Sequence, residues 1–194
     1  MPVQTQIVAA HTALLLMDFQ SGIVGRFVAE GDGLLERAGM AVEAARRAGL
    51  PVIYVVVAFR PGYPEVGARN GTFAAIRGSG RMLQGSPEVE VHPALAPQPG
   101  EAVVVKHRVG AFWATDLEVI LRAQGIDTLV LAGIATSGVV LSTVRAAADR
   151  DYRLVVLGDC CADADPEVHR VLLGKVFPRQ AEVVPVVEWV GGLG

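Results

Sequence analysis

Cysteine is scarce in this 194-residue sequence, and its two copies, Cys160 and Cys161, are adjacent. Adjacent cysteines cannot form an ordinary structural disulfide with each other, which excludes a fold held together by disulfides. Free cysteine is among the residue types most often found buried. We therefore interpret this pair as two buried thiols in a reducing compartment.

Charge is also scarce, because charged residues make up only 19% of the chain and the net charge is −3. Nucleic acids and anionic membrane surfaces both require a basic face, so the expected partner is a small molecule and neither of these. Apolar residues reach 52%, which is high for a soluble monomer. We expect part of this surface to be shared between the subunits of a homodimer or larger homo-oligomer.

The sequence has little that indicates a membrane segment or a metal site. Residues 1–19 contain no basic leader, and their apolar run is far shorter than the roughly 20 residues that span a bilayer, so we expect a cytoplasmic protein. The histidines show no spacing typical of metal ligands, and we predict no metal and no cofactor. They are His11, His92, His107 and His169.

What the sequence does contain is a series of short apolar runs separated by helical patterns. Such runs predict buried strands, and their alternation with helices predicts one α/β domain over residues 1–194 with a parallel sheet. Asp32 and Asp165 are the expected N-caps of two of the helices. We expect strands at 13–17, 51–57, 102–105, 127–132, 152–157 and 183–187, and helices at 32–48, 114–124, 139–150 and from 165 onward.

Residues 59–100 show little regular pattern, and a stretch of this length in a compact domain is usually a functional loop or lid. Up to position 81 it carries four arginines against one acid, Glu65. One interpretation is a solvated basic loop. The other is that one or two of the arginines bind a substrate carboxylate, to which the guanidinium group is well matched. The four are Arg60, Arg69, Arg77 and Arg81.

The turn after the fourth predicted strand, GIATSGVVLST at residues 133–143, is the centre of the expected site. In an open α/β sheet such a turn lies at the carboxyl edge, where ligands bind and a helix N-terminus offers N–H groups to an anion. Asp18 and Lys106 follow two other strands and are expected to meet the turn there. An acid, a cation and a donor-rich turn suit hydrolysis, although the turn contains no cysteine and no serine that is obviously placed as a nucleophile.

Three segments in order resemble motifs of the isochorismatase-like (cysteine hydrolase) superfamily. They are the acid motif LMDFQ at 16–20, the lysine segment at 104–117, and the fourth strand with its turn at 125–136. The resemblance runs from about His11 to Val187. It implies a Rossmann-like three-layer α/β/α fold with a six-stranded parallel sheet, assembly as dimers or larger oligomers, and a non-proline cis peptide bond between Ile134 and Ala135.

The resemblance also implies roles for individual residues. In the amidase branch of this superfamily an Asp and a Lys activate a Cys three residues after the turn's Thr, and the matching positions here are Asp18, Lys106 and Val139. Valine cannot attack a carbonyl, so the usual thiolate mechanism is unavailable at this position. The remaining matched positions would form the turn or bind substrate: Gln20, Phe112, Ile134, Ala135, Thr136 and Ser137.

The true isochorismatases also lack the cysteine, and they hydrolyse a vinyl ether by acid catalysis. By this resemblance Asp18 would be the acid, with burial raising its pKa and Lys106 opposing that effect. The leading hypothesis is therefore a hydrolase of a small anionic metabolite that forms no covalent intermediate. The alternatives are a catalytically silent relative that binds a metabolite, an oligomeric partner protein, and an amidohydrolase that uses Ser137, Cys160 or Cys161 as an unexpected nucleophile.

Overall fold

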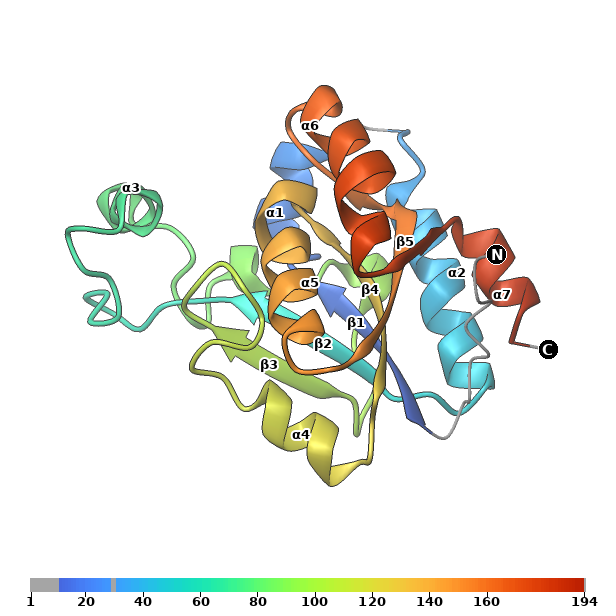
Figure 1. The fold of residues 1–194 in the computed structure, drawn as a ribbon. Helices are drawn as coiled ribbons and strands as arrows, with labels where there is room; N and C mark the ends of the chain where they lie inside the picture. The colour runs from blue at the N-terminus through green and yellow to red at the C-terminus, as the bar shows by residue number, and fades with distance from the viewer. Residues whose placement is uncertain (1–10, 29–30, 194) are drawn as a thin grey trace.

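The computed structural model describes residues 11–28 and 31–193, and the first ten residues, in which we predict no leader, lie outside this part. A six-stranded sheet forms the centre, with helices on both of its faces (Figure 1). The strand order is β3-β2-β1-β4-β5-β6, and every neighbouring pair is parallel. The strands are β1 Thr12–Met17, β2 Val52–Val57, β3 Ala102–Lys106, β4 Thr128–Ile134, β5 Arg153–Ala162 and β6 Glu182–Val184.

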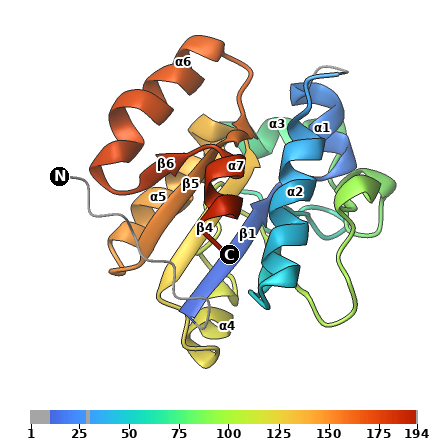
Figure 2. The same ribbon diagram turned by 90° about the vertical axis from the view of Figure 1, so that its right-hand side faces the viewer.

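The two faces of the sheet bury separate apolar clusters, because side chains alternate along each strand. In β1, Leu15 and Met17 join one cluster, whereas Leu14 and Leu16 join the other. The first cluster is covered by α4 Leu117–Ala123, α5 Leu141–Ala148 and the π-helical segment Leu172–Val176, which continues α6 Pro166–Val171. The second is covered by α1 Ser21–Phe27, α2 Leu34–Arg47 and α7 Val186–Gly191, and Figure 2 shows α2 and α7 side by side.

The predicted six-stranded parallel fold is thus confirmed, and the differences lie mainly at strand ends. The predicted strand 152–157 continues to Ala162, so Cys160 and Cys161 lie within β5. The predicted strand 183–187 was wrong in its second half. Proline has no N–H to donate to a ladder, and Pro185 is the N-cap of α7.

Three helix starts also differ from the prediction. Asp32 does not cap α2, because Gly33 in a left-handed conformation occupies that position and Asp32 Oδ1 accepts a hydrogen bond from Arg37 (3.2 Å). The helix expected from 114 begins at Leu117, since Ala114 has a φ of +54°, outside the helical range. The helix expected from 139 begins with a π-helical turn at Thr136–Val140 and continues as α5. Asp165 caps α6 as predicted.

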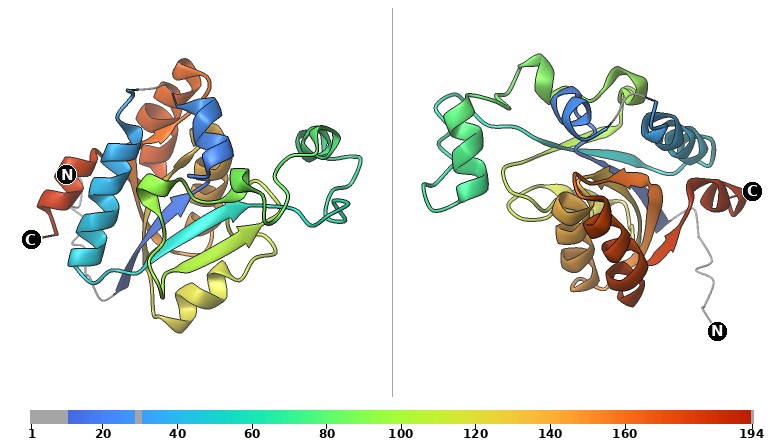
Figure 3. Two further views of the ribbon diagram at one scale, coloured as in Figure 1. Left: turned by 180° about the vertical axis from the view of Figure 1, so that it is seen from behind. Right: turned by 90° about the horizontal axis from the view of Figure 1, so that it is seen from above.

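The segment expected to be a loop or lid contains a nine-residue helix, α3 Gly71–Ser79, together with two short 3-10 turns. Figure 3 shows that α3 stands apart from the sheet layers. This segment has its own small apolar cluster, in which the ring of Phe59 lies 5.7 Å from that of Tyr63 and 5.5 Å from that of Phe73. Residues 59–89 are therefore an organised excursion from the sheet.

Candidate active site

Asp18 and Lys106 meet at the carboxyl edge of the sheet, although their strands are separated by β2. Asp18 directly follows β1 with a φ of +61°, and its N–H donates to the carbonyl of Val55 in β2 (2.8 Å). Lys106 is the last residue of β3, and its Nζ lies 2.9 Å from Asp18 Oδ2. Nζ also donates to the carbonyl of Arg108 (3.1 Å). The two side chains are only 8% and 2% exposed, so this is a buried ion pair.

The Asp18 carboxyl group uses one of its oxygens in this pair. Its other oxygen, Oδ1, is buried and has no hydrogen-bond partner in the part of the chain that the structure describes. Burial raises the pKa of Asp18 above its usual value, and the nearby charge of Lys106 lowers it only in part. Asp18 is therefore a group that holds a proton more readily than an ordinary aspartate.

A cavity of about 680 Å³ opens onto this pair. Two of its walls are helices, α1 and α3, and the turn after β4 forms another. Most of the lining is apolar, which is typical of small-molecule sites in which a few polar groups fix the ligand. The apolar side chains that dominate the walls are Ile23, Phe27, Phe73, Ile76, Met82 and Val139.

The turn after β4 lines the cavity with its apolar residues, and its two polar residues lie outside the lining. A non-proline cis peptide bond joins Ile134 and Ala135, as expected, and both residues line the cavity with Val139. Thr136 and Ser137 are not among the lining residues. The Thr136 hydroxyl donates to the Ala162 carbonyl (3.1 Å). The Ser137 N–H donates to a carboxylate oxygen of Asp163 (2.6 Å). These two predicted site residues therefore fix the turn to the exit of β5.

His169 was not linked to this turn by its sequence spacing. It lies on α6, and its Nδ1 is 2.8 Å from the Thr136 hydroxyl oxygen. Because Thr136 is fully buried and outside the cavity lining, this contact joins α6 to the turn. It does not activate a nucleophile in the cavity.

Gln20 and Phe112 are also outside the cavity lining. The Gln20 amide donates to the carbonyls of Val57 (2.9 Å) and Val89 (2.8 Å) and accepts from the Val57 N–H (2.8 Å), so it ties the excursion to β2. Phe112 packs with Tyr152 at 5.9 Å between ring centroids and belongs to a core cluster. Both side chains act on the framework around the site.

The two cysteines are buried in β5 and do not line the cavity. Burial raises the pKa of Cys161 to about 12 and also raises the pKa of Cys160. Since the thiolate is the nucleophilic form, both thiols are poor candidates for attack on a substrate.

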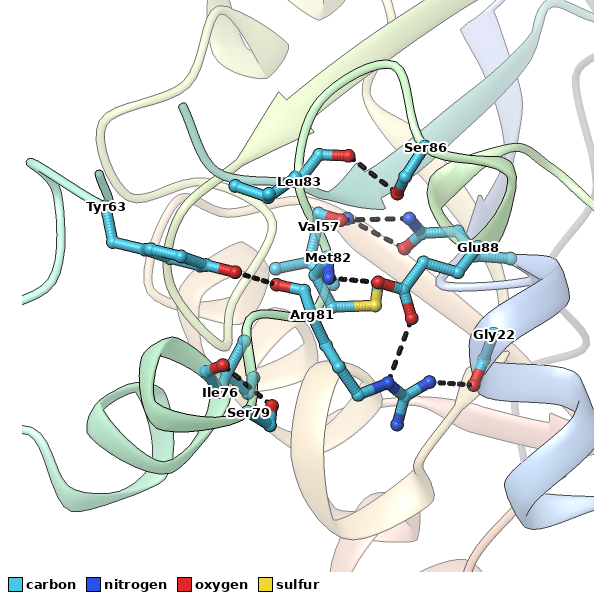
Figure 4. A network of polar contacts seen from close by, with 11 residues as sticks. Gly22, Val57, Tyr63, Ile76, Ser79, Arg81, Met82, Leu83, Ser86 and Glu88 are labelled. Atoms are coloured by element: carbon cyan, nitrogen blue, oxygen red, sulfur yellow. Dashed lines mark hydrogen bonds and ion pairs between the residues drawn. The ribbon is translucent and has the colours of Figure 1, made fainter. Parts of the chain in front are cut away.

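Among the four arginines of the excursion, Arg81 alone is part of the cavity lining. Its Nε lies 2.9 Å from Glu88 Oε2, and an Nη donates to the Gly22 carbonyl at the start of α1 (3.3 Å), as Figure 4 shows. Arg60 pairs with Glu65 (2.8 Å), whereas Arg69 and Arg77 are exposed and outside the lining.

Sequence reasoning missed α1, which contributes a second arginine, Arg26, to the lining. The signal was available, because Ile23, Arg26 and Phe27 follow Asp18 at spacings that place them on one face of a helix.

Among the described residues, no group of three or more His, Cys, Asp or Glu side chains is arranged to hold a metal ion. No helix in this part of the chain has the length and apolar character needed to cross a membrane.

Comparison with known proteins decides the family. Residues 12–188 match the model of the isochorismatase domain. This chain belongs to the isochorismatase family. The first-strand acid, the lysine and the turn predicted from their motifs thus lie in a fold of the expected family.

Two relatives and one solved structure illustrate how far the similarity to this isochorismatase-family chain extends. The ureidoacrylate amidohydrolase RutB of Methylobacterium radiotolerans is 33% identical, over 95% of this chain and 80% of that protein. The maleamate amidohydrolase of Pseudomonas putida is 31% identical, over 89% of this chain and 82% of that protein. The crystal structure of a cysteine hydrolase from Pseudomonas syringae pv. phaseolicola matches with a TM-score of 0.90 at 25% identity, covering 98% of this chain and 96% of that one.

Proposed function

We propose that this isochorismatase-family chain hydrolyses a small organic anion at Asp18 and Lys106 without forming a covalent enzyme intermediate. The observation that carries the proposal is the position of Asp18. It is buried at the cavity, it keeps one carboxyl oxygen without a partner among the described residues, and its pKa is raised by burial. A carboxyl group of this kind can deliver a proton to a ligand.

Val139 supports the absence of a covalent step. By the resemblance, position 139 matches the nucleophilic cysteine of the amidase branch, and here a valine lines the same cavity as Asp18 and Lys106. A branched alkyl group has no lone pair with which to attack a carbonyl. The reaction that remains is attack by water on a substrate that protonation has made electrophilic.

Hydrolysis of an enol ether fits these groups. Asp18 donates its proton to the carbon of the enol double bond, which leaves an oxocarbenium ion on the ether-bearing carbon. Water adds to that carbon and returns a proton to Asp18, and the resulting hemiketal breaks into an alcohol and a carbonyl compound. Lys106, 2.9 Å from Asp18 Oδ2, stabilises the carboxylate that exists between the two proton transfers.

Amide hydrolysis is the second candidate, because RutB and the maleamate enzyme are named amidohydrolases. It would need a nucleophile other than a side chain at position 139. Ser137, Cys160 and Cys161 do not line the cavity, which favours the enol ether. Two further candidates are a silent relative that binds a metabolite and an oligomeric partner protein.

We also propose that the chain acts as a single domain within a homodimer or larger homo-oligomer. The support is its exposed apolar surface, in which Trp113 is 62% and Val119 is 70% exposed. Surfaces of this kind are common where subunits meet.

The deciding experiment measures turnover of isochorismate, other small enol ethers and small primary amides by the wild-type protein and by Asp18→Asn. Enol-ether hydrolysis that disappears in Asp18→Asn supports the proposal. Amide hydrolysis that survives in Asp18→Asn contradicts it and moves attention to Ser137, Cys160 and Cys161. Binding of these compounds without turnover of any of them also contradicts the proposal and favours a binding protein.

A further inference from the structure

We infer that Arg26 binds the anionic end of the substrate, and that an apolar body separates this end from the reacting group at Asp18. The substrate class is therefore a carboxylate on an aromatic or alkyl framework. The inference rests on the proposed function only in taking this cavity as the substrate site.

The face of α1 gives Arg26 its position. Helical spacing places Ile23, Arg26 and Phe27 together, and all three line the cavity. Arg26 is exposed, whereas Asp18 is buried. The two groups therefore mark the outer and the inner parts of one cavity.

Among the described residues, Arg26 differs from the other cations of the lining in its lack of an acidic partner. Four charged side chains line the described part of the cavity, and two of them, Asp18 and Lys106, contact each other at 2.9 Å. Arg81 is paired with Glu88. Arg26 has no ion-pair partner among the described residues, unlike Arg81 in the same lining. Within the described lining, Arg26 is thus a cation without an acidic partner, and an anionic group is its complement.

The nature of the anion follows from the guanidinium group, and the nature of the body follows from the walls. A guanidinium group matches a planar carboxylate with two parallel hydrogen bonds. Both helical walls of the cavity contribute apolar side chains, with Phe27 on α1 and Phe73 and Ile76 on α3. Aromatic and alkyl groups are stabilised there by removal from water, whereas a second charge would be desolvated at a cost.

Binding measurements test this inference without any need for turnover. Isothermal titration calorimetry compares phenylacetate and 3-phenylpropanoate with their uncharged primary amides, phenylacetamide and 3-phenylpropanamide. The proteins are the wild type, Arg26→Gln and the matched control Arg69→Gln, which removes an exposed arginine outside the cavity lining. Thermal unfolding checks that each variant is folded.

We expect the carboxylates to bind the wild type more tightly than their amides do. Arg26→Gln should raise the Kd of the carboxylates about fivefold, as loss of a partly exposed charge-assisted pair would, and leave the amides unchanged. Arg69→Gln should change neither. Equal binding of carboxylates and amides to the wild type, no carboxylate binding at millimolar concentration, or an unchanged Kd in Arg26→Gln overturns the inference.

The outcome is separable from that of the proposed function. Loss of turnover in Asp18→Asn combined with an unchanged carboxylate Kd in Arg26→Gln would leave the reaction standing and remove the role of Arg26. A raised Kd in Arg26→Gln combined with full turnover in Asp18→Asn would do the reverse.

Discussion

The Lys106 ammonium group reaches across a whole strand to lie 2.9 Å from the Asp18 carboxylate. Lys106 is in register with Val57 on β2, and Met17, which precedes Asp18, is in register with Val55 on the same strand. The pair therefore forms only when β1, β2 and β3 are assembled. Because both side chains are buried, removal of Lys106 changes the protonation of Asp18 as well as any chemistry at the site.

The first prediction concerns pH. As an acid, Asp18 works only while it is protonated, so kcat/KM for an enol ether should fall as pH rises through its raised pKa. The free energy of unfolding should also fall as pH rises from the ordinary pKa of Asp18 to its raised pKa in the folded protein. In this range the folded protein binds more protons than the unfolded chain. Urea unfolding at a series of pH values, compared with Asp18→Asn, measures the second effect. A stability that rises through this window for wild type relative to Asp18→Asn would contradict the pKa direction.

The second prediction concerns Lys106→Met. Because the charge of Lys106 lowers the pKa of Asp18, its removal should raise that pKa further and extend the protonated state to higher pH. Carbon-13 NMR titration of the Asp18 carboxyl group measures the change. Lys175→Met, which removes an exposed lysine, is the control and should leave the pKa of Asp18 unchanged. A lower pKa in Lys106→Met would show that Lys106 does not act on Asp18 as described.

The third prediction concerns Val139→Cys. A thiol at this position would line the same cavity as Lys106, and a nearby cation favours the thiolate. We expect alkylation by iodoacetamide to be roughly tenfold or more faster than in Val140→Cys, because Val140 is the next residue along the chain but does not line the cavity. Equal rates in the two variants would show that position 139 is not a nucleophile position, and hydrolysis of small primary amides by Val139→Cys would extend the result to catalysis.

The fourth prediction concerns the contact between the excursion and α1. Glu88 holds Arg81 (2.9 Å) and accepts from the Met82 N–H (2.5 Å), and a Cβ on Gly22 would lie 2.7 Å from the Glu88 Cβ, so the two segments pack closely. Glu88→Ala should lower stability by about 1–2 kcal/mol. It should also speed proteolytic cleavage within residues 59–81, more than Glu88→Gln does, because glutamine keeps an acceptor. Identical cleavage in wild type and Glu88→Ala would exclude this contact as a restraint.

The sheet could be predicted because its strands are nearly continuous apolar runs, which bury both faces of a parallel sheet. Asp18 and Lys106 could be placed together because the carboxyl ends of parallel strands share one edge. The limits of β5 could not, since Gly158 and Asp159 interrupt its apolar pattern, and the register between β4 and β5 shifts between Leu131 and Gly133.

The cavity walls were harder to predict for a different reason. Helix α3 turns Phe73 and Ile76 toward the cavity and a small local cluster, and it contains Gly71 and Gly78, so its sequence lacks a strong helical stripe. The contact between Thr136 and His169 could not be predicted from the residues next to either one. It depends on the path of the chain between them. The resemblance predicted which positions form the site. The direction of each side chain depends on the packing of the folded chain and was not predicted.

The third apolar cluster, which joins the excursion to Val57 at the end of β2, has a consequence for how this protein can diverge from its relatives. Phe59, Tyr63 and Phe73 pack with one another outside the two clusters of the sheet. Substitutions in this excursion can therefore reshape a cavity wall without repacking the strands that hold Asp18 and Lys106. New ligand preferences can evolve, or be engineered, on an unaltered acid and cation.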